Sequence, residues 1–432
     1  MLLLGVPKKR MVNDAARARD RIEELDIKAV TSEALTELLG LPGMRVKGFA
    51  VEEQEGQAYL HLICEHCHQI AICPRCGEAM AGGYDSEERS VRHLDIWGMR
   101  TILHFPQRRF GCTVCGKSFT EVLEWIDRKR RQTLAFEQYI YECIHKRKMT
   151  RKQIAQQEGV HEETVLGIFK RWGTRAVQRS ERQPVRVLGI DEIYLGDKEY
   201  VLVLSDLGRH CVIAVLANRL KATLEQWLDE LSEKERRAIK VVSMDMWEAY
   251  RQAVQNRLSH AEIVADRFHV VKQLNHQLDL LRRDLRKHGD EALQELLKNS
   301  RWILLKNRCN LTPKEETKLQ RILEASQELR TVYLLKEELR TVCEKIKNRD
   351  RAERFLQSWV LRAETSGIRY LKRFAKTLRN WWLEFLNYFV DGVTQGFVEG
   401  INRAIRGIIN RAFGFHKFEH FRLQVLVECG AT

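Results

Sequence analysis

The sequence predicts an α/β protein of several domains, and three observations lead to that fold class. Its 432 residues exceed what a single hydrophobic core usually organises, and 44% of them are hydrophobic, as in globular proteins. Closely spaced C-x-x-C pairs predict a small zinc ribbon. Residues 185–270 alternate apolar strand runs with helical spacing, whereas residues 270–390 keep helical spacing almost throughout. We therefore expect a metal-bound sheet, a mixed α/β domain and a long helical segment in one chain.

The N-terminal part of the chain is predicted to be a helical lead-in followed by short strands. Residues 10–39 are polar with helical periodicity, and Leu39–Gly43 has the glycine and proline content of a turn. Residues 44–120 carry short alternating runs, such as Arg100–Phe105, which predict strands. The apolar start Met1–Val6 is too short for the core of a secretory signal, so we expect a cytoplasmic protein. No apolar run approaches the ~20 residues that span a bilayer, so a membrane protein is not expected.

Two matched zinc knuckles stand within this region, Cys73-Pro-Arg-Cys76-Gly77 and Cys112-Thr-Val-Cys115-Gly116. In each, two intervening residues and a following glycine allow the tight turn that brings two thiolates to one ion. Four thiolates complete a tetrahedral site and leave no open position, so one structural zinc is expected rather than a catalytic one. The alternative is a set of reduced thiols without metal.

A third pair, Cys64-Glu-His-Cys67, lies directly upstream, with His66 and His68 available beside it. It could form a second zinc site, or it could be a strand end that leads into the first knuckle. We favour the strand end, because the sequence offers no fourth pair to close a second four-ligand site. The other five cysteines are scattered singly and are predicted to be small buried hydrophobes.

Residues 150–172 have the rhythm of a helix-turn-helix. Thr150 and Gln153 stand at capping-box positions of a first helix, and Gly159 provides the turn before a second helix. The basic run Arg128–Arg131 nearby favours DNA binding over an ordinary helical hairpin. In a DNA complex the second helix would enter the major groove. Its polar residues expected to face DNA are Thr164, Lys170 and Arg171.

Five apolar runs predict the strands of the α/β domain, with a helix at about Leu224–Lys234 before the fourth. The runs are Val185–Ile190, Tyr200–Ser205, His210–Leu216, Ile239–Met244 and Ala261–Ala265. Acids follow three of them, at Asp191, Asp245 and Asp266. An acid after a strand is often a helix cap or part of a surface turn. Acids that follow neighbouring buried strands can instead share one crevice.

Carboxylates in such a crevice suit magnesium ions, which serve phosphodiester chemistry in pairs. Two aspartates would leave two ions under-ligated, so a third acid is expected from a distant helix. The helical run Gly396–Arg411 near the C-terminus carries Glu399 and Asn402 one turn apart. Its arginines suited to phosphate contact are Arg403, Arg406 and Arg411.

Charge points the same way. Lys and Arg number 73 against 59 Asp and Glu, a formal net charge of +14, which suggests a polyanionic partner and argues against a small-molecule substrate.

The sequence resembles the ISL-three family of bacterial insertion-sequence transposases from about Leu38 to about Val427. The resemblance is carried by the order and number of several short motifs. These motifs are Leu39–Gly43, Cys73–Gly77, Arg108–Glu121, Gly189–Glu192, Asp266–His269, Val398–Asn402 and the aromatic tail Arg411–Arg422. The upstream pair Cys64–Cys67 does not belong to the family pattern, so its role stays open.

The resemblance implies a ribonuclease-H-like catalytic domain of the DDE type, with Asp191, Asp245 and Glu399 as catalytic acids and ligands of two Mg (or Mn) ions. Asp266 is the rival of Asp245 for the second position, and His269 and Asn402 are further candidates for the catalytic pocket. The implied domains are a lead-in (1–43), a zinc-ribbon region (44–121), a helix-turn-helix domain (122–180), the catalytic domain (185–270 plus 391–432) and a helical insertion (271–390).

The insertion carries more basic than acidic residues, which suggests a role in clamping DNA or in dimerisation. Its adjacent Trp381 and Trp382 cannot both face the core from one continuous helix. The implied partner is double-stranded DNA, at transposon ends and at the target, and we expect a homodimer in the synaptic complex and a bacterial, nucleoid-associated location.

The implied function is a transposase that binds terminal inverted repeats and catalyses metal-dependent cleavage and strand transfer. The alternatives are a catalytically inactive or domesticated DNA-binding protein and a structure-selective nuclease of the same fold.

Overall fold

The computed structural model describes residues 31–180, 183–196, 199–391, 396–412, 414–415 and 417–431, and within these ranges the side chains of residues 391–399 are not described. The chain divides between Trp172 and Gly173 into two compact units. Helix α5 (Glu162–Arg179) begins in the first unit and ends in the second. The expected lead-in over residues 1–30 lies outside the described residues.

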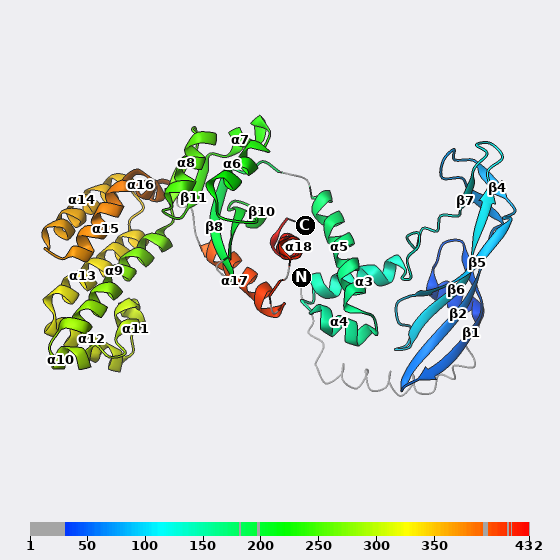
Figure 1. Ribbon diagram of the computed structural model, residues 1–432, viewed down its shortest axis with the longest axis horizontal. Coiled ribbons are helices and arrows are strands. Elements are labelled where there is room, and N and C mark those ends of the chain that lie inside the picture. Colours follow the sequence, from blue (N-terminus) through cyan, green and yellow to red (C-terminus); the bar gives the residue numbers. More distant parts are fainter. Residues whose placement is uncertain are drawn as a thin grey trace, which may run out of the picture. The chain divides into compact units, whose positions relative to one another are not determined.

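The first unit is built on a twisted sheet of strand order β1-β2-β6-β5, with β7 paired to β6 (Figure 1). The strands are β1 (Met44–Gln54), β2 (Gln57–His66), β5 (Asp85–Arg92), β6 (Arg100–Gly111) and β7 (Ser118–Thr120). Inward residues Leu62, Leu103 and Phe105 are fully buried, and Leu35 of α2 (Ser32–Leu39) packs onto them. A second, two-stranded sheet, β3 (Ile70–Ile72) with β4 (Ala79–Ala81), carries the first zinc knuckle.

Three helices follow β7 in the first unit: α3 (Leu134–His145), α4 (Arg151–Glu158) and α5. Thr150 caps α4 in a capping box with Gln153, as the sequence predicts. Gly159 ends α4 with a left-handed φ of 64°, where a side chain would be strained. Val165, Ile168 and Phe169 of α5 are buried. The helix-turn-helix geometry is therefore present in these residues.

The second unit contains a five-stranded mixed sheet of order β10-β9-β8-β11-β12. Its strands are β8 (Val187–Gly196), β9 (Glu199–Asp206), β10 (Cys211–Leu216), β11 (Val241–Met244) and β12 (Glu262–Ala265). Strands β8, β11 and β12 are mutually parallel, and β9 and β10 pair antiparallel. This is the mixed sheet expected for the catalytic fold, and the five predicted strands are confirmed.

Helices cover both faces of this sheet (Figure 1). On one face, α6 (Lys221–Asp229) and α8 (Glu248–Arg257) pack Leu224 and Tyr250 against Leu188 and Ile190. On the other, α17 (Gly396–Arg411) and α18 (Phe418–Cys429) pack Ile405 and their other apolar residues against Ile193 and its neighbours. The helix expected at Leu224–Lys234 is in fact two helices, α6 and α7 (Glu233–Ala238), because Ser232 caps a new helix.

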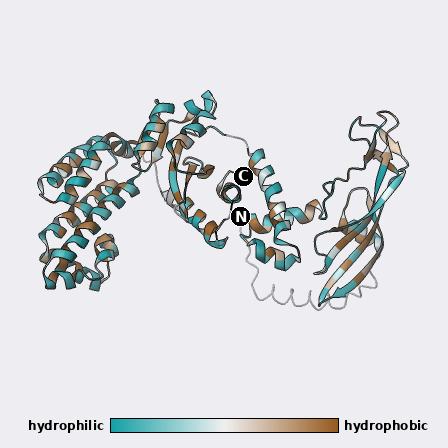
Figure 2. Ribbon diagram, viewed as in Figure 1, coloured by the Kyte–Doolittle hydropathy of each residue, from teal (hydrophilic) through white to brown (hydrophobic). Residues whose placement is uncertain are grey.

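Helices make up the described chain from Arg267 to residue 391, apart from short turns. They are α9 (Arg267–His288), α10 (Glu291–Leu296), α11 (Arg301–Leu305), the short 3-10 helix η2 (Arg308–Asn310), α12 (Pro313–Ala325), α13 (Gln327–Lys345), α14 (Arg349–Thr365), α15 (Arg369–Asn380) and α16 (Trp382–Asp391). Their hydrophobic faces pack inward around Trp359, which is fully buried, while hydrophilic faces point out (Figure 2).

Together these parts confirm the predicted fold class. Among the described helices, none is long and apolar enough to cross a membrane.

Candidate functional site: a four-cysteine centre and a row of three aspartates

Two equivalent turns bring four cysteines together in the first unit. The ligand atoms of Cys73, Cys76, Cys112 and Cys115 all lie within 4.8 Å of one another, with Cys73 and Cys115 sulfurs 3.8 Å apart and Cys76 and Cys112 sulfurs 3.5 Å apart. Gly77 and Gly116 donate backbone hydrogen bonds to the carbonyls of the first cysteine in each knuckle, both at 2.9 Å, and both have positive φ. The arrangement is a tetrathiolate cage consistent with one structural zinc.

The first thiol of each knuckle ionises more readily than the second: the pKa values of Cys73 and Cys112 are lowered, and those of Cys76 and Cys115 are raised. Backbone N–H groups of Arg75 and Cys76 lower the pKa of the Cys73 thiol to about 6, despite the opposing effect of desolvation. A small core beneath the cage, which includes Phe110 and Phe119, depends on the same turns.

The upstream pair does not join this cage or form another. Cys64 is buried in the sheet core, and burial raises the pKa of its thiol to about 11. Cys67 is exposed, and His66 lies 3.1 Å from Glu121 and 2.8 Å from the carbonyl of Pro106. Within the described residues, the four-cysteine cage is the single group of three or more His, Cys, Asp or Glu side chains whose ligand atoms all lie within 4.8 Å of one another. The strand-end interpretation fits this placement.

Of the three polar residues that the sequence predicts to face DNA from the helix-turn-helix, one is instead held in an ion pair within the domain. Thr164 and Lys170 are half-buried on α5. Arg171 instead pairs with the buried Glu137 of α3, which also accepts a 3.0 Å hydrogen bond from the indole of Trp172. The guanidinium of Arg171 therefore fastens α5 to α3.

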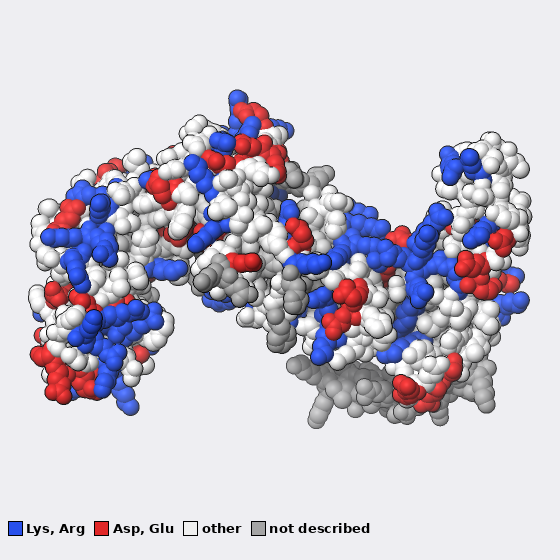
Figure 3. Space-filling model, in the orientation of Figure 1, with Lys and Arg blue, Asp and Glu red and all other residues white. Residues whose placement is uncertain are grey.

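Basic side chains nevertheless gather over these helices and the loop before them (Figure 3). We call this group the basic helical surface. Its exposed members are Arg128, Lys129, Arg131, Lys146, Arg147, Lys148 and Lys152. Such a surface suits contact with phosphates.

In the second unit, three aspartates stand in one row across neighbouring parallel strands. The register pairs Ile190 of β8 with Met244 of β11, and Met244 with Ala265 of β12. The residue that follows each of these three is an aspartate, so Asp191, Asp245 and Asp266 lie level with one another across the sheet. Strand alternation turns Asp191 towards the α17 face, with Ile193, and turns Glu192 towards α8.

One expectation about Asp191 is wrong. The sequence suggested an acid after the end of a strand, as at Asp245 and Asp266, but β8 continues for five residues beyond Asp191, to Gly196. Beyond Ile190 the strand goes on as an alternation of polar and apolar residues and stays paired with β9, with one shift of register between Tyr194 and Gly196.

His269, in the first turn of α9, lies between the three carboxylates. Its Nδ1 is 2.9 Å from Oδ2 of Asp245, and its Nε2 is 3.9 Å from oxygens of both Asp191 and Asp266. Asp266 caps α9 by accepting a 2.6 Å hydrogen bond from the backbone N–H of Phe268, and this fixes the helix start that carries His269. The side chains of Asp191, Asp266 and His269 are 13%, 11% and 14% exposed, whereas that of Asp245 is 35% exposed.

The pKa values follow from this crowding. Burial opposes the charge of His269, but the hydrogen bond to Asp245 and the three carboxylates outweigh it and raise the pKa of His269. Burial acts against ionisation of Asp245 too, yet His269 holds the pKa of Asp245 below its usual value. Burial, with Asp191 and Asp245 nearby, raises the pKa of Asp266 to about 6. Asp266 therefore resists ionisation, whereas Asp245 beside His269 favours its charged form.

Asn402 of α17 closes the row on the Asp191 side. Its Nδ2 donates a hydrogen bond to Oδ2 of Asp191, while its Oδ1 is buried and meets no hydrogen-bond partner among the described residues. An unpartnered amide oxygen beside crowded carboxylates is a donor set that suits a divalent cation. Glu399 lies one turn earlier on α17, but its side chain lies outside the described residues.

The C-terminal arginines differ in their surroundings. Arg403 and Arg406 are exposed on α17, whereas Arg411 pairs with Glu428 of α18.

Sequence reasoning did not single out the polar contacts on the other face of β8. Glu192 accepts a 2.7 Å hydrogen bond from the hydroxyl of Tyr250 and lies 3.3 Å from Arg219. The signal was available: Glu192 directly follows Asp191, so in an extended strand it must face the opposite side of the sheet.

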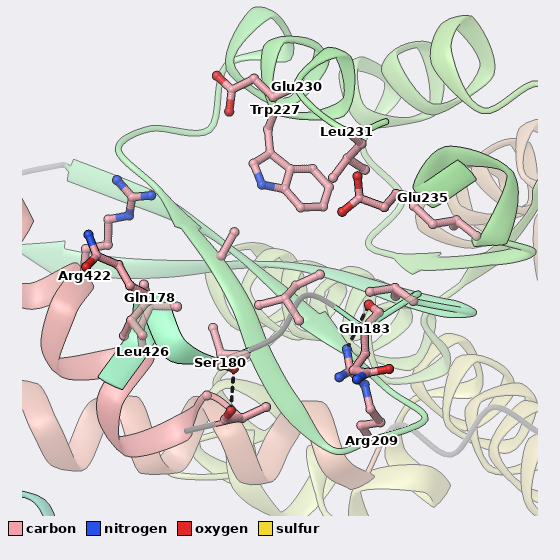
Figure 4. A pocket seen from close by; sticks show the side chains of 18 residues that line it. Gln178, Ser180, Gln183, Arg209, Trp227, Glu230, Leu231, Glu235, Arg422 and Leu426 are labelled. Atoms are coloured by element: carbon pink, nitrogen blue, oxygen red, sulfur yellow. Dashed lines mark hydrogen bonds between the residues drawn. The ribbon is translucent and has the colours of Figure 1, made fainter. Parts of the chain in front are cut away.

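A cavity of about 600 Å³ lies along β10 (Figure 4). Trp227 and Leu231 line one side, and Arg422 of α18 and Arg209 line others. None of the three aspartates, His269 or Asn402 lines it, so this cavity is separate from the acidic row.

Comparison with known proteins covers nearly the whole chain. Residues 188–425 match a family model described as a transposase of the DDE type and the ISL3 family. Residues 69–115 match the zinc finger of transposases IS204, IS1001, IS1096 and IS1165, and residues 121–173 match the helix-turn-helix domain of the ISL3 transposase family.

Two relatives extend these matches over most of the chain. The chain is 30% identical, over 389 residues, to the transposase for insertion sequence element IS1001 of Bordetella parapertussis, which covers 88% of this chain and 95% of that one. It is 28% identical, over 375 residues, to the transposase for insertion sequence element IS1557 of Mycobacterium tuberculosis, which covers 79% of this chain and 82% of that one.

Proposed function

The chain belongs to the ISL3 family of transposases, and from that premise we propose that it binds the terminal inverted repeats of an insertion sequence, cuts DNA at those ends and joins the freed 3′ ends to target DNA. In the first step water attacks phosphorus and the bond to the 3′ oxygen breaks. In the second, the resulting 3′ hydroxyl attacks a target phosphorus and displaces another 3′ oxygen. Both are in-line substitutions at phosphorus that one acidic site can serve.

The observation that carries this proposal is the level row of Asp191, Asp245 and Asp266 around His269. A structural cluster of three crowded acids would cost stability without a benefit, whereas a metal-dependent site needs that crowding. The proposed domain division places this row in residues 185–270 plus 391–432, with residues 271–390 as the helical insertion.

Asp191, Asp245 and Glu399 are the proposed ligands of two Mg or Mn ions, and the carbonyl oxygen of Asn402 fits the same role. Bound ions would stabilise the charge that develops on the attacking and leaving oxygens. The chain's own residues prepare the site: Asn402 fixes one oxygen of Asp191, and His269 fixes one oxygen of Asp245.

Asp266 is better suited to a positioning role than to the second ligand position. One of its oxygens is committed to the N-terminus of α9, and the residue is almost fully buried. Asp245, by contrast, is the most exposed of the three and so is the most accessible to DNA and ions. We therefore assign Asp245 to the ions and Asp266 to the placement of His269.

DNA recognition is assigned to the first unit. The basic helical surface would contact phosphates, α5 would enter the major groove, and the zinc ribbon would support a further contact with the terminal repeat. Arg403 and Arg406 of α17 would contact phosphates beside the acidic row. Two ends must be cut together in transposition, so a homodimer is the proposed active species.

The test is an assay of the purified full-length chain on DNA that carries its own element's terminal repeats. Cleavage and joining in Mg²⁺ or Mn²⁺, both abolished by Asp191→Asn, would support the proposal. Sequence-specific binding without cleavage in either metal would instead identify a DNA-binding protein. Cutting of junctions without preference for the repeats would identify a structure-selective nuclease.

A further inference from the structure

A row of aromatic rings and one arginine lies on the α8 face of the sheet and reaches Trp247, two residues after Asp245. Tyr194 of β8 and Tyr200 of β9 pair directly across the two strands, with ring centroids 5.1 Å apart. The guanidinium of Arg219 lies 4.3 Å from the ring of Tyr200 and 5.2 Å from that of Trp247. The ring of Trp247 in turn packs beside that of Tyr250 of α8, with centroids 6.4 Å apart. We call these five residues the aromatic–arginine row.

The carboxylate of Glu192 holds two members of the row in place. Glu192 accepts a hydrogen bond from the Tyr250 hydroxyl and holds Arg219 at 3.3 Å. The guanidinium is thereby fixed between two rings, and the rings are held at defined positions. A surface with this degree of order loses little side-chain entropy when a flat ligand stacks on it.

The outer members of the row remain open to solvent. Tyr194 is 53% and Trp247 is 42% exposed, although both are large hydrophobic side chains. Burial would be the expected state if the row served only to pack α8 onto the sheet, as the fully buried Tyr250 does.

The row is also adjacent to the acidic site along two strands. Tyr194 follows Asp191 by three residues on β8, and the backbone N–H of Trp247 donates a 2.7 Å hydrogen bond to the carbonyl of Asp245. Asp191 faces the other side of the sheet, so Asp245, two residues before Trp247, is the link between the row and the acidic site. A DNA strand whose phosphate reaches Asp245 would bring its neighbouring nucleotides to Trp247 and the rings beside it.

Resting on the proposed function, we infer that the aromatic–arginine row binds unpaired nucleotides next to the phosphate that is cut. Base faces stack on exposed aromatic rings and on guanidinium planes irrespective of base identity, whereas bases in an intact duplex are already stacked on one another. The row therefore selects DNA whose strands are separated at the cleavage point. The positive charge of Arg219 attracts the phosphates of those nucleotides.

The experiment compares three DNA probes by fluorescence anisotropy with the full-length chain. One is a blunt duplex, one carries a short single-stranded thymidine tail, and one carries a tail of equal length made of abasic nucleotides. The abasic tail has the same phosphates but no bases, so the difference between the two tails measures stacking alone. The variants are Trp247→Ala and Trp247→Phe, with Trp302→Ala as the matched control, since Trp302 is 65% exposed on α11 and lies outside the row.

We expect the wild-type chain to bind the thymidine tail about tenfold more tightly than the abasic tail. Trp247→Ala should abolish that preference, while Trp247→Phe and Trp302→Ala should keep most of it. Equal affinity of the wild-type chain for both tails, or an equal loss of preference in Trp247→Ala and Trp302→Ala, would overturn the inference. The readout needs no catalysis, so a chain that prefers the thymidine tail but never cuts terminal repeats would retain the row's assignment and refute the proposed function.

Discussion

Nδ1 of His269 donates a hydrogen bond to Oδ2 of Asp245 at 2.9 Å. The imidazole thereby fixes the orientation of Asp245, the most exposed of the three aspartates. The contact joins the end of strand β11 to the first turn of α9, and Asp266 determines where that turn begins. We propose a positioning role for His269: it orients Asp245, a proposed ligand, and also places positive charge where cations are proposed to bind.

This dual role predicts opposite effects of His269→Ala on two measurements. Cleavage should fall on the order of 100-fold, because Asp245 loses its fixed orientation. Affinity for Mn²⁺, measured by titration calorimetry, should stay the same or rise, because a competing positive charge is removed. His269→Gln, which can still donate to Asp245, should recover part of the cleavage. A parallel loss of Mn²⁺ affinity would mean that His269 is itself a ligand, contrary to this assignment.

Substitution by asparagine separates the two rivals for the second metal position. Asp245→Asn should reduce cleavage on the order of 1000-fold, as should Asp191→Asn, because each removes a proposed ligand charge without a change in size. Asp266→Asn should cost no more than about tenfold, because asparagine caps helices as well as aspartate does.

The matched control for these variants is Asp290→Asn, since Asp290 caps α10 through the backbone N–H of Leu293 far along the sequence from the row. Thermal unfolding should report intact folds in all four variants. If Asp266→Asn were as damaging as Asp191→Asn while Asp245→Asn stayed active, the two assignments would have to be exchanged.

The sequence predicted the three-aspartate row in part, and the register explains why. Asp245 and Asp266 each follow a short strand of mostly apolar, buried residues, so a hydrophobic run was enough to locate both ends. Asp191 lies inside β8 instead, because that strand continues past its apolar run with alternating faces. The pairing register, which brings the three residues level, depends on pairs such as Ile190 with Met244 and Met244 with Ala265, far apart in sequence. No local sequence pattern indicates such pairs.

Contacts between distant residues account for the other differences. Arg171 had the position of a DNA-facing residue on α5, but Glu137, on another helix, pairs with it. Trp381 and Trp382 could not both face inward from one helix, and the structure resolves this with a break: α15 ends at Asn380, α16 begins at Trp382, and both rings pack on the core. By contrast, the Thr150 capping box and the zinc knuckles are set by residues close in sequence and were predicted.

The four-cysteine cage predicts one zinc per chain. Cys76→Ser should lower the zinc content from one equivalent to near zero, measured by atomic absorption, and should unfold the small core around Phe110 and Phe119. Binding to terminal-repeat DNA should weaken with it if the ribbon supports recognition. Cys67→Ser is the matched control, because Cys67 is an exposed cysteine on the same segment and outside the cage. Zinc loss in Cys67→Ser, or two equivalents in the wild-type chain, would contradict a single site.

The basic helical surface predicts a defined salt dependence of DNA binding. Lys152 and Arg147 are both exposed beside the helix-turn-helix, and each neutralised phosphate contact contributes about 0.9 to the slope of log affinity against log salt concentration. Lys152→Gln and Arg147→Gln should therefore each reduce that slope by about one unit and weaken binding to terminal and unrelated DNA alike, because phosphate contacts carry no sequence information. Lys234→Gln provides the control, since Lys234 is exposed on α7 next to Glu233 and belongs to the second unit. An unchanged slope in both variants, or an equal decrease in Lys234→Gln, would show that DNA contacts lie elsewhere on the chain.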